Sequence, residues 1–291
     1  MNHRISLLLL CSFLPSAPLF AEELPVTRLT KDGSFKQHLK WSPDGKQFLF
    51  TRIHEGKMAI WLMKADGTEM KRLVSKDTPH FDGDWSADSK RVVFVLDILQ
   101  GTDGKLQIDM IHADGTNHTN VLPHKAFDES PRFSPDEQQI LWVSTRDGNP
   151  ELYVCQADGT KIQRLTSEVA FDLHPAWSPD GKKIAFSSGR SGKQKIYAMD
   201  ADGKKVKRLT EGEGIDSWPA WSPDGKQIAF VSHREGNYDV FLMNSDGSGL
   251  RNLTHHSAQD TSPTWSPDGK SIAFISTRDG GSDVYILQLA K

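Results

Sequence analysis

The chain has 291 residues, and its 35 Lys and Arg against 38 Asp and Glu give a formal net charge of −3. With this balance and no long basic run, nucleic acid is not expected as a partner. Only Cys11 and Cys155 are present, and Cys11 falls in an N-terminal segment that we expect to be removed. No intramolecular disulfide is therefore expected in the mature protein, and packing must supply its stability.

The first predicted element is a secretory signal over residues 1–21. Two basic residues precede an apolar run over residues 5–14, and small and turn-forming residues follow up to Ala21. This pattern is typical of a cleaved leader, and the run is too short to form a transmembrane helix. We therefore expect a periplasmic or secreted protein whose mature domain covers residues 22–291 and has no transmembrane segment.

A short phrase, close to Trp-Ser-Pro-Asp-Gly-Lys, then occurs six times. Its first residue, called the anchor below, recurs at spacings of 44, 48, 44, 44 and 44 residues. The anchors are Trp41, Trp85, Phe133, Trp177, Trp221 and Trp265. A fixed period in the forties, built from short apolar runs and turns, predicts a β-propeller with one blade per repeat. Aromatic anchors are expected to pack between blades.

Each repeat carries the signals of four strands. In the fourth repeat the anchor run is followed by apolar runs at Ile184–Phe186 and Ile196–Met199, and then by Arg208–Thr210. Ser-Pro-Asp-Gly joins the first two runs and Asp-Gly joins the last two, and both sequences favour tight turns. The apolar runs are continuous rather than alternating, which indicates sheets covered on both faces.

The sixth repeat ends after Val284–Leu289 and lacks a fourth strand. Val26–Thr30, which stands before the first repeat, resembles the fourth strands at Ile162–Thr166 and Val206–Thr210. We therefore predict an all-β, six-bladed β-propeller whose ring is closed by an N-terminal strand that completes the last blade.

The predicted ring has two different faces. The Ser-Pro-Asp-Gly and Asp-Gly turns emerge on one side, called the turn face, and they are nearly identical between blades. The connections between second and third strands, and those between blades, emerge on the loop face and vary. Since binding residues concentrate on variable loops held by a rigid scaffold, a ligand is expected on the loop face.

Blades three to six share two charged positions on the loop face, an Asp five residues before the anchor and an Arg thirteen residues after it. The expected pairs are Asp128 with Arg146, Asp172 with Arg190, Asp216 with Arg234, and Asp260 with Arg278. Because both positions are present together or absent together, we interpret them as structural ion pairs rather than catalytic groups.

Departures from the repeat supply the candidate binding residues. Blades one and two lack the Asp and Arg, blade two has a longer loop, and two other blades carry bulky residues where Ser stands elsewhere. The candidates are Lys36, His38, His54, His80, Asp82, Asp97, His174 and Trp218. Solvated loop residues are the alternative interpretation for each of them.

Motifs for known chemistry are missing from the sequence. It contains no Gly-x-Ser-x-Gly, phosphate-binding Gly-x-x-x-x-Gly-Lys or His-Glu-x-x-His sequence. His38, His54 and His80 would form a metal site only if the fold brought three imidazoles together. No catalytic residue, metal or cofactor is therefore predicted.

The repeat, Asp-x-x-x-Pro-x-Trp-Ser-Pro-Asp-Gly-Lys-x-Ile-Ala-Phe followed by Ser-x-Arg, Tyr-x-Met-x-x-Asp-Gly and Arg-Leu-Thr, resembles the TolB-type propeller repeat over essentially the whole mature chain. Similar repeats serve in TolB, in prolyl-oligopeptidase-type proteases and in oligogalacturonate lyases, so the resemblance implies fold more strongly than function. TolB proteins also carry an α/β domain and reach TolA through their N-terminal region. Here the leader runs directly into the closing strand, so the resemblance covers the propeller only.

The sequence as a whole favours an exported, non-catalytic and monomeric propeller that binds a protein or cell-envelope ligand on its loop face. The resemblance implies a peptidoglycan-associated lipoprotein as one such partner. The alternative is a metal-dependent polysaccharide lyase of the oligogalacturonate type, whereas a peptidase would need a hydrolase domain.

Overall fold

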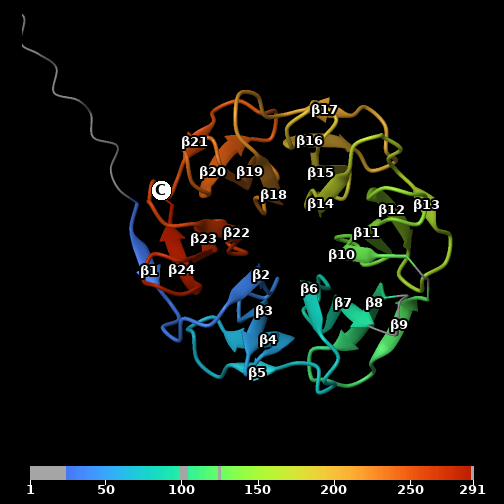
Figure 1. Ribbon diagram of the computed structural model, residues 1–291, viewed down its shortest axis with the longest axis horizontal. Helices are drawn as coiled ribbons and strands as arrows, with labels where there is room; N and C mark the ends of the chain where they lie inside the picture. Colours follow the sequence, from blue (N-terminus) through green and yellow to red (C-terminus); the bar gives the residue numbers. More distant parts are fainter. Residues whose placement is uncertain (1–23, 99–103, 124–125, 290–291) are drawn as a thin grey trace, which may run out of the picture.

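The computed structural model describes residues 24–98, 104–123 and 126–289, which form six four-stranded antiparallel sheets arranged as a ring (Figure 1). The predicted all-β propeller is confirmed. The expected leader, residues 1–21, lies outside the described residues. Within the described ranges, no helix has the length and apolar character needed to cross a membrane.

Five blades are continuous in sequence, with their strands in the order inner to outer. Blade 1 has β2 (Lys36–Trp41), β3 (Gln47–His54), β4 (Lys57–Lys64) and β5 (Lys71–Arg72), and blade 2 has β6 (His80–Trp85), β7 (Arg91–Ile98), β8 (Lys105–His112) and β9 (Thr119–Leu122). Blade 3 has β10 (Asp128–Phe133), β11 (Gln139–Ser144), β12 (Glu151–Gln156) and β13 (Gln163–Arg164), and blade 4 has β14 (Asp172–Trp177), β15 (Lys183–Ser188), β16 (Lys195–Asp200) and β17 (Lys207–Arg208). Blade 5 has β18 (Asp216–Trp221), β19 (Gln227–Ser232), β20 (Asp239–Asn244) and β21 (Arg251–Asn252).

Blade 6 is built from both ends of the chain. It contains β22 (Asp260–Trp265), β23 (Ser271–Ser276) and β24 (Asp283–Gln288), and β1 (Val26–Arg28) pairs antiparallel with β24. Beyond β1, Thr30 accepts a hydrogen bond from the Val284 amide at 3.0 Å and donates one to Asp283 at 2.6 Å. The predicted closure of the ring is therefore confirmed.

The repeated turn is held by its own side chains. In blade 1, Ser42 Oγ donates to Asp44 Oδ1 at 2.7 Å and accepts from the Gln47 amide at 2.9 Å. Asp44 Oδ1 also accepts from the Lys46 amide, and Gly45 has a φ of 75°, a conformation that glycine adopts without strain. Equivalent bonds recur in every repeat, which explains why this phrase is the most regular part of the sequence.

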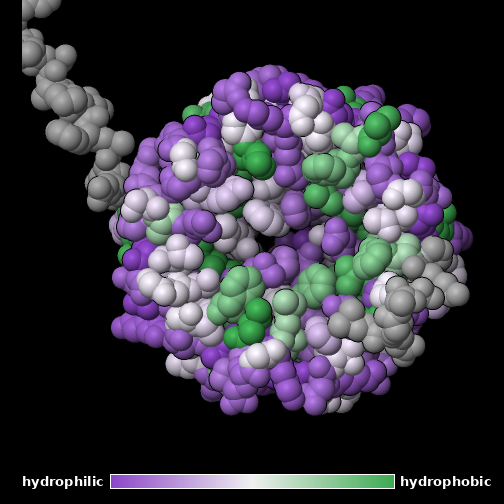
Figure 2. Space-filling view, in the orientation of Figure 1, coloured by the Kyte–Doolittle hydropathy of each residue, from purple (hydrophilic) through white to green (hydrophobic). Residues whose placement is uncertain are grey.

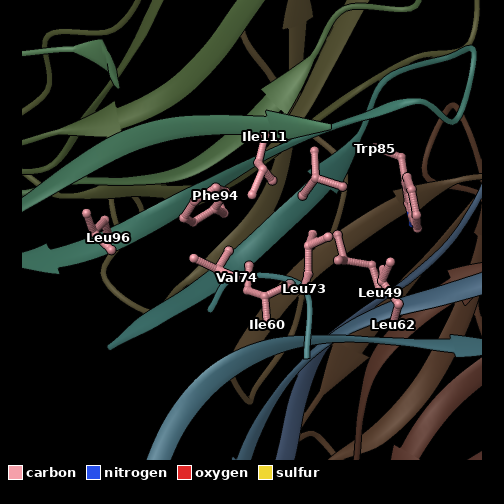
Figure 3. Close-up of a cluster of buried hydrophobic side chains, with 10 residues drawn as sticks. Leu49, Ile60, Leu62, Leu73, Val74, Trp85, Phe94, Leu96 and Ile111 are labelled. Atoms are coloured by element: carbon pink, nitrogen blue, oxygen red, sulfur yellow. The ribbon is translucent and has the colours of Figure 1, made fainter. Parts of the chain in front are cut away.

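The hydrophobic core lies between neighbouring blades rather than within them. In Figure 3, Leu49 and Ile60 of blade 1 lie against Val74, Phe94 and Ile111, which come from the connection to blade 2 and from blade 2 itself. All five side chains are at most 2% exposed. Each sheet is covered on both faces by its neighbours, which accounts for the continuous apolar runs.

Candidate functional site

The four predicted Asp and Arg positions lie close together in the fold. The Arg Nη2 atoms lie 3.2, 2.8, 2.9 and 2.8 Å from carboxylate oxygens of Asp128, Asp172, Asp216 and Asp260, in chain order. Each Arg also donates through Nε to a Ser hydroxyl and stacks on two aromatic rings, as Arg278 does on Phe274 and Tyr285. These arginines are therefore held from several directions, and the Asp side chains are fully buried.

Blade 1 places Lys36 where blades 3 to 6 have the buried Asp. Lys36 Nζ binds Asp32, and it lies 3.3 Å from Asp283 Oδ1 of blade 6. Asp32 also pairs with Arg52. Burial alone would raise the pKa of Asp32, but hydrogen bonds from Lys36 and Ser34 and the charges of Lys36 and Arg52 outweigh it and lower that pKa to about 2. Lys36 therefore joins the first and last blades, and its side chain is buried away from a loop-face ligand.

His80 occupies the equivalent position in blade 2 and is also fully buried. Its Nδ1 accepts a hydrogen bond from the Ile60 amide of blade 1 at 2.8 Å. An acceptor nitrogen requires the neutral ring, and burial lowers the pKa of His80 to about 4, which agrees with that state. The structure thus gives His80 a contact between blades and no exposure to a ligand.

Each innermost strand contains a β-bulge that turns one residue toward the axis of the ring. The pairing shifts by one residue at the same place in all six blades, and the residue three before each anchor has a φ between 45° and 53°. The six residues are His38, Asp82, Ser130, His174, Trp218 and Ser262. We call this set the axial ring, and it contains four of the predicted binding residues.

The axial ring is largely occupied by its own contacts. Asp82 Oδ1 lies 3.0 Å from Arg132 Nη1, and its other oxygen accepts from Ser130 Oγ at 2.7 Å. The His174 and Trp218 rings lie 4.7 Å apart, and burial lowers the pKa of His174 to about 3. A space of about 20 Å³ lies among four members of the ring, His38, His174, Trp218 and Ser262. The ring therefore narrows the channel and leaves little room for a ligand.

The two remaining predicted residues lie at the ends of strands on the loop face. His54 has a side chain that is 46% exposed, and Asp97 is half-buried near the end of β7, where it pairs with Leu106 rather than lying in the longer loop. Residues 99–103 of that loop lie outside the described part. His54 thus lies at a strand end, His38 in the channel and His80 between blades. Within the described ranges, no group of three or more His, Cys, Asp or Glu side chains is arranged to hold a metal ion.

Exposed apolar residues on the loop face were not predicted from the sequence. The residue six before each anchor accepts a backbone hydrogen bond from the residue eighteen positions later, at 2.8–3.1 Å in all six blades. Phe35, Phe127, Phe171 and Ile215 occupy this position in blades 1, 3, 4 and 5, and they are 45, 50, 44 and 40% exposed. We call these four residues the loop-face apolar set.

The apolar set lies where each connection between blades enters the innermost strand. Figure 2 also shows hydrophobic patches at several places beside the central hollow of the face in view, with hydrophilic surface between them. Comparing repeats could have found the set, because Phe127, Phe171 and Ile215 immediately precede the Asp that recurs in blades 3 to 6. The sequence did not show that these side chains are exposed, since most apolar residues at repeated positions lie in the core.

These features define a six-bladed β-propeller with regular turns on one face, and with variable connections and the loop-face apolar set on the other. The family model described as TolB beta propeller domain matches residues 99–216 and 209–291, more than half of the chain. The chain therefore belongs to the TolB β-propeller domain family.

Individual relatives agree with this assignment. A Protein TolB homolog from Chlorobium luteolum is 30% identical over 125 residues, which cover 43% of this chain but only 27% of that homolog. The structure of putative TolB from Agrobacterium tumefaciens has a TM-score of 0.71 and covers 91% of this chain and 97% of its own, and at 21% identity this likeness concerns the fold alone. Oligogalacturonate lyase from Vibrio parahaemolyticus has a TM-score of 0.66 at 14% identity, with coverages of 94% and 95%, and this likeness concerns the fold alone.

Proposed function

We propose that this protein is an exported, non-catalytic propeller that binds a protein or cell-envelope ligand through its loop face. The observation that carries the proposal is the loop-face apolar set, in which three Phe and one Ile are each at least 40% exposed at equivalent positions. Aromatic side chains on a rigid rim provide large contact area at low entropic cost, as is typical of protein-binding surfaces. Repetition around the ring would allow one partner to contact several blades.

Two further observations support the proposal. Membership of the TolB family suggests protein partners, with a peptidoglycan-associated lipoprotein as the first to test. The basic and apolar pattern of residues 1–21 supports export to the periplasm or beyond, where such a partner would be met. The histidines that would favour a metal-dependent lyase do not converge, so we do not propose that activity.

The test compares the affinity of the purified lipoprotein domain for the wild-type protein and for a triple variant, Phe127→Ser, Phe171→Ser and Ile215→Ser. Loss of three exposed apolar anchors should raise the Kd at least about tenfold, because central aromatic contacts often contribute more than 1 kcal/mol each. Titration calorimetry measures the effect, with peptidoglycan fragments as a second ligand.

A matched control carries the same type of change elsewhere. Ile162, Val206 and Leu250 are 47, 39 and 41% exposed and follow the Asp-Gly turns of blades 3 to 5. Their triple Ser variant should bind like the wild type. Equal weakening in both variants, or no binding of either ligand by the wild type, would contradict the proposed function.

A further inference from the structure

A second concave surface lies at the centre of the opposite face. A cavity of about 460 Å³ opens among the Ser-Pro-Asp-Gly turns, where the channel widens beyond the axial ring. A volume of this size is typical of small-molecule sites. A smaller space of about 20 Å³ among the axial-ring residues adjoins this cavity, since Lys40, Arg132 and Pro219 line both.

The wall of the cavity is rigid and apolar. The six anchor aromatics line it. So does the residue two positions after each anchor, which is proline in five blades and Ala87 in blade 2. The anchors are held in place: Trp221 Nε1 donates to Ala176 O at 3.2 Å, and Trp265 Nε1 donates to Ala220 O at 3.1 Å. Flat indole faces and proline rings favour an aromatic or alicyclic body.

The floor of the cavity is asymmetric in charge. It is formed by the residue before each anchor, which is Lys40, Asp84 and Arg132 in blades 1 to 3 but small in the other three. The small residues are Ala176, Ala220 and Thr264. A ligand would therefore meet charged groups on one side and small side chains under Trp177, Trp221 and Trp265 on the other.

Three buried donors near the floor have no partner among the described residues: Arg132 Nε and the indole Nε1 atoms of Trp85 and Trp177. Arg132 is paired with Asp82 through Nη1. The three donor atoms are buried in the wall rather than open to the cavity, whereas Lys40 lines it.

The Lys40 ammonium makes no hydrogen bond or ion pair among the described residues, although the charges of Asp84 and Asp82 act on it. Asp84 accepts a hydrogen bond from the Phe133 amide at 3.2 Å. Burial lowers the pKa of Lys40 to about 8, so this group remains mostly protonated at neutral pH. Burial also raises the pKa of Asp84, and the neighbouring charges of Lys40 and Arg132 oppose that shift.

We propose that the turn-face cavity binds a small amphipathic carboxylate. Its carboxylate accepts a hydrogen bond from Lys40, and its apolar body packs against the Trp and Pro wall of blades 4 to 6. This site is independent of the loop-face ligand, because the two lie on opposite sides of the axial ring.

The test measures binding of 2-naphthoate and of its neutral analogue 2-naphthamide by titration calorimetry. The full-length mature protein should bind the carboxylate at least about tenfold more tightly, since a charge-assisted hydrogen bond is lost in the amide. Lys40→Met should remove that preference. Lys46→Met, on an exposed turn of the same face, should preserve it.

A second variant tests the apolar side of the cavity without altering the charge that Lys40→Met removes. Ala220→Leu narrows the apolar side without changing charge, so it should weaken both compounds about equally while the melting temperature shows that the ring is intact. The loop-face triple variant should bind 2-naphthoate normally, which separates this site from the proposed function. No binding of 2-naphthoate up to its solubility limit, equal affinity for both compounds, or an unchanged preference in a folded Lys40→Met protein would overturn the inference.

Discussion

At the scale of single residues, blade 1 replaces the buried Asp–Arg pair of blades 3 to 6 with a different buried ion pair. Asp128, Asp172, Asp216 and Asp260 each bind an Arg from the same blade. In blade 1, Lys36 takes the position of the Asp and turns to Asp32 and Asp283. A buried charge is retained because it is paired from two elements, and its partner Asp32 should therefore matter for stability.

Asp32→Asn tests this contact by its dependence on pH. A carboxyl whose pKa is lowered in the folded state, here from 3.8 to about 2, contributes stability that is present above about pH 4 and is lost as the pH falls through about 2. We expect the variant to lose about 1 kcal/mol at pH 7, less than the shift alone implies because Asp32 is partly exposed. Urea unfolding should show this difference shrink between pH 4 and pH 2.

The exposed carboxylate Glu55 provides the control for this experiment, since its side chain is 83% exposed. Glu55→Gln should change the free energy of unfolding little at either pH. An Asp32→Asn deficit that stays constant down to pH 2 would show that the network with Lys36 and Arg52 is not the source of the stabilisation.

Comparison of repeats predicted the Asp and Arg positions from the sequence, but it could not predict which departures face solvent. Lys36 and His80 stood out because they break the pattern, and both turned out to be buried between blades. His38 and Trp218 also stood out, yet their place in the channel depends on a bulge that neither residue type signals. A bulge arises from pairing with the next strand, and propensity alone does not encode it.

At the scale of elements, β1 is the segment on which closure depends. Val26, Thr27 and Arg28 pair with Leu287, Ile286 and Tyr285, and Arg28 Nη2 lies 2.7 Å from Asp283. Thr30 bonds the amide of Val284 in the same way that Thr210 bonds that of Ile196 in blade 4. The sequence predicted this element correctly because the closing strand keeps the repeat's own residues.

Deleting Val26–Thr30 should lower the melting temperature by at least about 5 °C, since the change leaves β24 with an open edge and Asp283 without two of its partners. In a domain of this size, 1 kcal/mol corresponds to roughly 2–4 °C. Differential scanning calorimetry measures the shift. Thr27→Ala, at an exposed side chain of the same strand, should have the melting temperature of the wild type. An unchanged melting temperature after the deletion would contradict the role of β1 in closing the ring.

At the scale of the whole molecule, one repeat produces two faces with different chemistry. The period and turn residues were sufficient to predict the blade number and the order of strands. The surface of the two faces could not be predicted from the sequence in the same way, because the exposure of Phe127 and the partial burial of Lys40 depend on how neighbouring blades meet. The loop-face apolar set is therefore the main support for a binding function.

Hydrogen–deuterium exchange with a bound partner, the lipoprotein domain or a peptidoglycan fragment, tests the proposed use of the loop face most directly. Our account predicts slower exchange in residues 126–130, 169–173 and 213–217, which contain Phe127, Phe171 and Ile215. The Asp-Gly turns on the opposite face should exchange at their unbound rates. Protection confined to those turns, with no change in the three loop-face segments, would contradict the account.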